Sequence, residues 1–166
     1  MKPMKALSLT QPYATLIALG AKRIETRSWS TSFRGPIAIH ASKGFPREYQ
    51  ESCAIEPFLS VLKAAGFTNT NELPKGAIVA VGRLVYVFLT GDTLNYRHLD
   101  RTVRGPNGLT YQITPQEIEF GDYSPGRFGW VLTDVVRLEQ PIPVKGALGL
   151  WNVPPMVMEQ IKRATE

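Results

Sequence analysis

Hydrophobic and polar positions alternate along several short stretches of the chain, and continuous apolar runs occupy others. Both patterns are typical of β-strands. They predict strands over 5–9, 23–29, 36–42, 76–90, 126–138 and 150–153. Apolar positions at helical spacing, bounded by proline and glycine, predict helices over 11–20, 45–66 with a break at Pro57, and 154–166.

This order of elements lacks the regular strand–helix alternation that a doubly wound parallel sheet requires. We therefore predict an α+β fold: a small, mostly antiparallel β-barrel with surrounding helices. A chain of 166 residues fits one domain, 1–166. Residues 91–125 are polar and weakly periodic. We expect them to form a mobile insertion, with a hairpin around Asn107-Gly108.

The composition, with 43% hydrophobic and 20% charged residues, is that of an ordered globular protein. No apolar run approaches the roughly 18 residues that span a bilayer, so no membrane partner is expected. The first residues lack the features of a signal peptide. Cys53 is the only cysteine and cannot form an internal disulfide. These features predict a cytoplasmic protein.

The positive charge is concentrated in the first part of the sequence. The whole chain carries +5, whereas residues 1–50 alone carry +6. A local excess of this kind attracts phosphate or another anion. The alternative is an ordinary solvated face.

The stretch "LGAKRIETRSW" at 19–29 collects charged and aromatic side chains. In a strand, alternation places Glu25, Arg27 and Trp29 on one face, and Lys22 at the helix-to-strand junction can reach the same surface. An indole can stack on a base, lysine and arginine bind phosphate, and glutamate can accept a hydrogen bond or act as a general base. The alternative is a structural ion pair of Glu25 with Arg27 or Lys22.

Further candidates lie elsewhere in the sequence. If strand 36–42 pairs with strand 23–29, His40 and Ser42 extend the polar surface into a pocket wall. His40 would be a hydrogen-bonded wall residue or a proton shuttle. The other candidate ligand contacts are Gln11 and Tyr13 in the first turn of the first helix, Lys43 after strand 36–42, and Arg127 at the start of strand 126–138.

Several cofactor signatures are missing from the sequence. No Cys/His spacing suggests zinc, and neither a phosphate-binding G-x-x-x-x-G-K-[ST] loop nor a G-x-S-x-G motif occurs. We therefore predict no metal and no organic cofactor.

The segments "LSLTQPYATLIALGAKRIETRSW" and "FRGPIAIHASK" closely resemble the ASCH domain, named for homology to activating signal cointegrator-1. The hallmark of that family, G-x-K-x-x-E-x-R after the first helix, is matched by Gly20, Lys22, Glu25 and Arg27. The later segment "GRFGWVLTDVVRLEQPIPVKGALGLWNVP" resembles the C-terminal half of bacterial members. The resemblance thus covers about 1–45 and 126–155, and leaves 45–75 and 91–125 without a recognised motif.

The resemblance implies a PUA-like fold whose relatives bind RNA, often through a modified or flipped-out base. It also implies a cleft beside the first helix, lined by the motif. We therefore predict an RNA- or nucleotide-binding domain with a basic cleft. The alternative is a metal-independent hydrolase acting on RNA, as a ribonuclease, or on a modified nucleoside such as an acylated cytidine. Lys22 or Glu25 would then transfer protons, and Arg27 or Lys43 would stabilise the developing anion.

The sequence differs from the small amidohydrolase branch of this family at two of its three site positions. That branch pairs the motif lysine with a threonine three residues later and an acid on a central strand. Here Glu25 replaces the threonine, and Ala80 or Gly82 stands where the acid would lie. A third interpretation is a protein-interaction module that binds a peptide.

Overall fold

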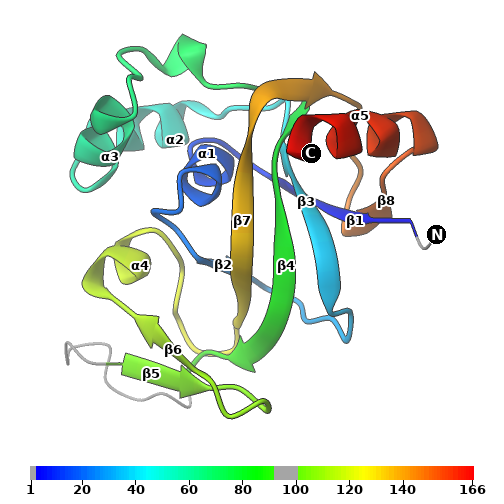
Figure 1. Ribbon diagram of the computed structural model, residues 1–166. Helices are drawn as coiled ribbons and strands as arrows, with labels where there is room; N and C mark the ends of the chain where they lie inside the picture. Colours follow the sequence, from blue (N-terminus) through cyan, green and yellow to red (C-terminus); the bar gives the residue numbers. More distant parts are fainter. Residues whose placement is uncertain (1–2, 92–100) are drawn as a thin grey trace. The chain divides into compact units, whose positions relative to one another are not determined.

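A computed structural model describes residues 3–91 and 101–166 (Figure 1). Its strands are β1 (Lys5–Leu9), β2 (Ile24–Arg27), β3 (Gly35–Ala41), β4 (Ala77–Leu89), β5 (Arg101–Arg104), β6 (Thr110–Ile113), β7 (Phe128–Pro143) and β8 (Leu150–Asn152). Its helices are α1 (Tyr13–Ala18), α2 (Arg47–Ser52), α3 (Phe58–Ala64), α4 (Pro115–Glu119) and α5 (Pro155–Thr165), with a short 3₁₀ turn at Thr70–Glu72. The predicted α+β class is confirmed.

The chain divides into two compact units. Unit 1 contains Met1–Ala21, Pro36–Gly82 and Asp134–Glu166, and unit 2 contains Lys22–Gly35 and Arg83–Thr133. The long strands β4 and β7 each contribute one part to unit 1 and the other to unit 2. The prediction of a single domain stays a prediction.

The strands of unit 1 are hydrogen-bonded in the order β7-β4-β3-β1-β8. β1 runs parallel to β3, with Ser8 opposite His40 in the register. On its other side β1 pairs antiparallel with β8, with Ala6 opposite Trp151. Consequently β1 is a central strand, which agrees with its largely apolar sequence.

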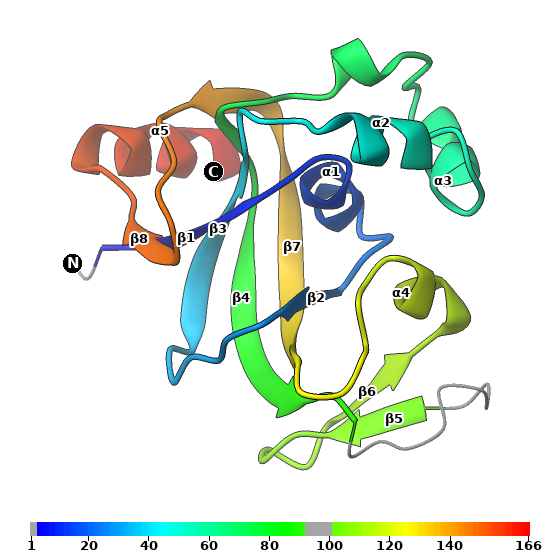
Figure 2. The same cartoon turned by 180° about the vertical axis from the view of Figure 1, so that it is seen from behind.

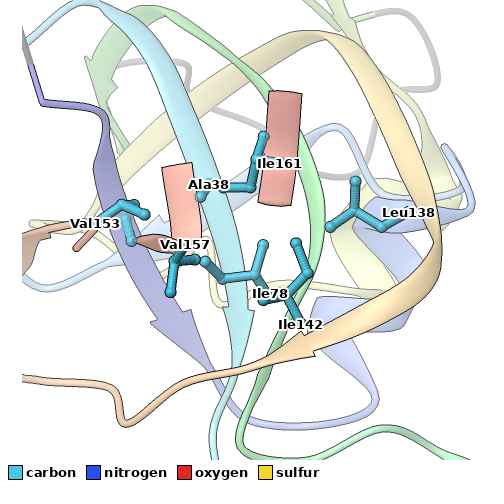
Figure 3. Packing of buried hydrophobic residues seen from close by; sticks show 8 residues of the cluster. Ala38, Ile78, Leu138, Ile142, Val153, Val157 and Ile161 are labelled. Carbon is cyan, nitrogen blue, oxygen red and sulfur yellow. The ribbon is translucent and has the colours of Figure 1, made fainter. Parts of the chain in front are cut away.

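Helix α5 covers part of this sheet (Figure 3). Its buried residues, Val157 and Ile161, lie four positions apart and therefore share one helix face. They pack on residues from four strands and the loop after β8: Ala6, Ala38, Ile78, Leu138, Ile142 and Val153. Burial of an aliphatic side chain of this size stabilises a fold by about 1.5–3 kcal/mol. The packing of α5 is thus a main source of stability in unit 1.

Helices α1 and α3 of unit 1 end two residues before the predicted limits at 20 and 66. Gly20, with φ of 76°, follows α1 in the left-handed conformation that glycine adopts most easily. Pro57 separates α2 from α3, so the predicted break in 45–66 is confirmed. Four aliphatic or small residues of α1 are buried, namely Ala14, Leu16, Ile17 and Ala18.

In unit 2 the strand order is β2-β7-β4, with β5 and β6 as a separate antiparallel pair. β2 is antiparallel to β7, and Glu25 lies opposite Trp130. The turn between β5 and β6 contains Gly108 with φ of 79°, so the hairpin predicted around Asn107-Gly108 is confirmed (Figure 2). Beyond it lies α4, a helix that the sequence analysis missed.

Strands 23–29 and 36–42 do not pair, so the condition for a shared pocket wall is not met. β2 pairs with β7, whereas β3 lies between β1 and β4. Hydrophobic alternation identifies which face of a strand is buried, but it does not identify the neighbouring strand. His40 and Ser42 therefore do not extend a wall formed by β2.

The insertion predicted at 91–125 contains regular structure in its second part, namely β5, β6 and α4. Its first part, 92–100, lies outside the described residues. The expected mobility of this region stays a prediction. Within the described part of the chain, no helix has the length and apolar character that crossing a membrane requires.

Candidate functional site

The predicted site residues fall into two sets, one in each unit. Unit 2 holds Lys22, Glu25, Arg27, Trp29 and Arg127. Unit 1 holds Gln11, Tyr13, His40, Ser42 and Lys43.

Lys22 is completely buried, with 0% of its surface exposed. Its Nζ donates a hydrogen bond of 2.6 Å to the backbone carbonyl of Phe120 and lies 3.7 Å from Glu25 Oε1. Burial lowers the pKa of Lys22, because charging an ammonium away from water is unfavourable, while Glu25 and Glu117 act in the opposite direction. The motif lysine thus ties the segment after α4 to the start of β2.

Glu117 is a second buried acid beside this lysine, and sequence reasoning missed it. It is 4% exposed, and one carboxylate oxygen accepts a hydrogen bond from the backbone N–H of Arg23. The other oxygen, Oε2, is buried, and no described residue meets the geometric limits of a hydrogen bond to it. Burial raises the pKa of Glu117, and the amide of Arg23 and the charge of Lys22 partly offset this effect. Glu117, from the region 91–125, therefore forms a buried polar cluster with Lys22 and Glu25.

The remaining motif residues become more exposed along β2 and beyond its end: Glu25 is buried, whereas Arg27 and Trp29 are partly exposed. Glu25, 7% exposed, accepts a hydrogen bond from the N–H of Thr26, and its Oε2 lies 3.7 Å from Arg27 Nη1. The Arg27 guanidinium lies 5.7 Å from the centre of the Trp29 ring. That ring in turn meets the buried Trp130 edge-to-face at 4.8 Å. Glu25 thus forms the ion pairs with Lys22 and Arg27 that were the structural alternative.

Arg127 braces the loop after α4. Its Nε donates to the carbonyl of Asp122 and lies 3.4 Å from the Asp122 carboxylate, while Nη2 donates to the carbonyl of Thr26. Hydrogen bonds from the hydroxyl and amide of Ser124 lower the pKa of Asp122, and Arg127 adds to the effect. The Arg127 side chain is 28% exposed.

In unit 1, Gln11 and Tyr13 have structural contacts. Gln11 is fully buried, and its amide donates to Thr15 Oγ1 and to the carbonyl of Pro74, both at 2.8 Å. The half-buried Tyr13 ring packs edge-to-face on Tyr49 and Phe58. Together these contacts join α1 to α2, α3 and the loop before β4.

The other three predicted residues of unit 1, His40, Ser42 and Lys43, line one pocket of about 910 Å³. Two lysines that sequence reasoning missed, Lys75 and Lys145, line it as well. The other lining residues are Ser8, Gly76, Pro143, Val144, Gly146, Ala147 and Leu148. None of these twelve described residues is acidic. The pocket lining therefore combines three lysines with apolar residues.

Backbone hydrogen bonds hold the three segments that form this pocket. The N–H of Ser42 donates to the carbonyl of Leu9, and the N–H of Gly76 donates to the carbonyl of Ala41, both at 2.8 Å. The N–H of Val144 donates to the carbonyl of Gly76. The lysine side chains are exposed, but the backbone that carries them is fixed on several sides.

His40 is 2% exposed and uses both ring nitrogens. Nε2 lies 2.8 Å from the carbonyl of Val144, and Nδ1 lies 2.9 Å from Ser8 Oγ. Trp151 Nε1 donates to the same Ser8 hydroxyl at 3.1 Å. Burial lowers the pKa of His40, although its bond to the Val144 carbonyl favours the charged ring. Two hydrogen bonds thus fix the histidine ring at the pocket wall.

Two other predictions concern cysteine and metal. Cys53 is a free, buried thiol whose pKa is raised by burial, so it is a weak nucleophile. The cytoplasmic location stays a prediction. Among the described side chains, no cluster of three or more His, Cys, Asp or Glu residues is placed to hold a metal ion.

Comparisons with known proteins agree on one family. The sequence model of the ASCH domain matches residues 7–141. Human activating signal cointegrator 1 is 24% identical over 159 residues, and its mouse counterpart is 24% identical over 157 residues. These matches cover 95% of this chain but only 23% of each relative.

Solved structures share the fold. A crystal structure of ASCH from Zymomonas mobilis matches with a TM-score of 0.51 and 15% identity, over 97% of this chain and 94% of that chain. A tyrosine-to-phenylalanine mutant of the same protein matches with a TM-score of 0.52 and 15% identity, over 98% of both chains. The predicted PUA-like fold is therefore confirmed.

Proposed function

Because the chain belongs to the ASCH domain family, we propose that it binds RNA or a nucleotide in the lysine pocket of unit 1. The observation that carries this proposal is the lining of that pocket. Lys43, Lys75 and Lys145 converge on one cavity whose described lining includes no acidic residue to neutralise them. Such a set of ammonium groups favours phosphate.

The size and the apolar part of the pocket support the same ligand class. A cavity of about 910 Å³ lies within the range of small-molecule sites and can hold a nucleotide. Leu148 lines it and is 99% exposed, which leaves an apolar side chain free to cover a base. Ser42 offers a hydroxyl to phosphate or ribose oxygens.

The predicted contacts outside this pocket stay predictions. Arg27, Trp29 and Arg127 are partly exposed and could still meet RNA, whereas Gln11, Lys22 and Glu25 are buried in internal hydrogen bonds or ion pairs. The hydrolase alternative assigned to Lys22 or Glu25 also stays a prediction. For Lys22 to reach a substrate, its bond to the Phe120 carbonyl must break.

Salt dependence of RNA binding tests the proposal. If three lysines neutralise three phosphates of a single strand, the logarithm of the affinity should fall with the logarithm of salt concentration at a slope of about −2. Affinity for a fluorescent single-stranded RNA would then drop roughly 20-fold between 50 and 200 mM salt. Fluorescence anisotropy measures both quantities.

Lysine substitutions test whether the salt-dependent RNA binding takes place in this pocket. Lys43→Ala, Lys75→Ala and Lys145→Ala should each weaken binding and make the slope shallower by about 0.7. Lys63→Ala removes the same charge from an exposed position on α3 and should leave the slope unchanged. Equal effects of all four substitutions, or an affinity that does not depend on salt, would contradict the proposal.

A further inference from the structure

We propose that Ser8 and His40 form a serine–histidine dyad that hydrolyses an acyl ester or amide on a phosphate-bearing ligand in the lysine pocket. The substrate class rests on the proposed function, whereas the chemistry rests on the hydrogen bonds around the two side chains. Both residues line the pocket. Ser8 is half-buried, whereas His40 is 2% exposed.

The strand register brings the two residues together. β1 and β3 are parallel neighbours, and Ser8 is the residue opposite His40. Residues opposite each other in paired strands project their side chains on the same face of the sheet. The distance of 2.9 Å between Ser8 Oγ and His40 Nδ1 follows from this placement.

The hydrogen-bond partners define which atom carries each proton. The Val144 carbonyl can only accept, so His40 Nε2 must donate to it. In the neutral ring Nδ1 then has a lone pair and accepts from the Ser8 hydroxyl. Trp151 Nε1 donates to Ser8 Oγ and holds that oxygen in position. Hydrogen bonds thus link a nucleophile (Ser8), a base (His40) and a group that orients the base (the Val144 carbonyl), as in hydrolases that act through serine.

Gly146 leaves space for this arrangement. A Cβ atom built at Gly146 would lie 2.6 Å from His40 Cε1 and 2.7 Å from Ser8 Oγ. Either distance is far below van der Waals contact, so a larger residue would displace the dyad. The glycine therefore allows the backbone of the 145–149 loop to pass directly beside the two reacting groups.

The reaction balances with water as the only co-reactant. Ser8 Oγ attacks the carbonyl carbon while its proton passes to His40 Nδ1, and the carbonyl electron pair forms an oxyanion. Lys43, Lys75 and Lys145 give the pocket a positive potential, which favours an anion formed there. The bond from carbon to the leaving oxygen or nitrogen then breaks, and the leaving group takes the proton from Nδ1. Water cleaves the acyl-serine by the same proton route, releasing a carboxylic acid and restoring Ser8.

Acylation with 4-nitrophenyl acetate tests the dyad without requiring a phosphate. We expect a burst of one nitrophenolate per chain and, by peptide mass spectrometry, an acetyl group on Ser8. Ser8→Ala should abolish the burst, and His40→Gln should slow it at least about 100-fold, as loss of a general base does. Ser60→Ala is the matched control, because Ser60 is exposed on α3 and its hydroxyl bonds the Glu56 carboxylate instead. Its burst should equal that of the wild type.

Acetyl groups confined to lysines or to other serines would overturn the dyad, as would an unchanged burst in His40→Gln. If Ser8→Ala does not fold, the peptide map of the wild type decides the question alone. Salt-sensitive RNA binding without acetyl-Ser8 would overturn only the dyad. Acetyl-Ser8 without binding of RNA or a nucleotide would overturn the proposed function, and the substrate class with it, but not the dyad. A 3′-O-acetylated nucleoside 5′-monophosphate should have a kcat/KM at least tenfold above that of the acetylated nucleoside. Equal values would overturn the assigned substrate class.

Discussion

For Lys22, the sequence motif predicts a ligand contact, whereas the structure shows a buried internal contact. As a residue type in a charged segment, a lysine predicts contact with an anionic ligand. In the structure its ammonium group bonds the Phe120 carbonyl and lies beside Glu25, with no exposed surface. Removing a buried cation that pairs with a buried acid is strongly destabilising, because the acid loses the charge that compensates its burial.

Lys22→Met tests whether this role is structural. The substitution keeps the length of the side chain but removes the ammonium group that pairs with Glu25 and donates to the Phe120 carbonyl. We expect the free energy of unfolding to fall by about 3–5 kcal/mol, measured by urea denaturation. Arg23→Met is the control, because Arg23 is exposed and should change stability by less than about 0.5 kcal/mol. Loss of ligand binding or turnover with unchanged stability would instead support the functional role predicted for Lys22.

The residues of the candidate site could be predicted from sequence only where a residue type was informative by itself. His40 and Ser42 were found because alternation places them on the polar face of strand 36–42, and Lys43 because it follows that strand. Lys75 and Lys145 were missed because each is a single lysine in a loop, with no periodic neighbours. Ser8 was missed because its partner lies 32 residues away, and only the strand pairing brings the two together.

Among the elements, α4 depends most on interactions with a distant part of the chain. It has five residues, and its N-cap is the side chain of Thr114. Isolated helices of this length are not stable in water. Glu117 anchors it to the backbone of Arg23, 94 residues away. The stability of α4 should therefore depend on the ionisation of this one carboxyl group.

Glu117→Gln tests this dependence. Because burial raises the pKa of Glu117, the folded protein binds a proton at a pH where the unfolded chain has released it. This contribution is complete below the ordinary glutamate pKa and is lost as pH rises through the raised value. The wild type should therefore lose stability relative to Glu117→Gln as pH increases from 4, by at most about 1.4 kcal/mol per pH unit. Urea denaturation at each pH measures the difference.

The exposed neighbour on the same helix is the control for that experiment. Glu119→Gln removes a carboxylate from α4 without touching the buried cluster, so its difference from the wild type should vary little over the same pH range. A pH-independent difference between the wild type and Glu117→Gln would show that this carboxyl has equal proton affinity in the folded and unfolded chains.

Local elements could be predicted from the sequence because their signals are local. The apolar runs of β4 and β7, the glycine after α1 and the proline between α2 and α3 all lie within the elements or directly beside them. Strand pairing could not be predicted, since β1 meets β8 across more than 140 residues. α4 was missed because its anchor is a contact with a distant residue and its own sequence is short and polar.

At the scale of the molecule, two compact units share the strands β4 and β7. Loss of either strand would remove sheet hydrogen bonds from both units, so we propose that they unfold together as one domain. Tryptophans occur in each unit: Trp29 and Trp130 in unit 2 and Trp151 in unit 1.

Fluorescence of selected tryptophans tests this cooperativity. Trp151→Phe leaves reporters only in unit 2, whereas the double substitution Trp29→Phe and Trp130→Phe leaves one only in unit 1. For each variant, the urea transition seen by fluorescence should coincide with that seen by far-ultraviolet circular dichroism. A fluorescence transition that precedes the loss of secondary structure in either variant would instead identify two domains.

The division of the chain into segments also has a consequence for synthesis on the ribosome. Every residue of unit 2 lies between Lys22 and Thr133, whereas unit 1 needs residues from Asp134 onward to provide β8 and the rest of β7. All of unit 2 therefore leaves the ribosome before β8 does. Until β8 emerges, the edge of β1 that pairs with it has no partner strand. During that interval β1 exposes unpaired backbone groups, which is the condition under which strands associate wrongly. Newly made chains are thus most open to aggregation or chaperone binding just before β8 emerges.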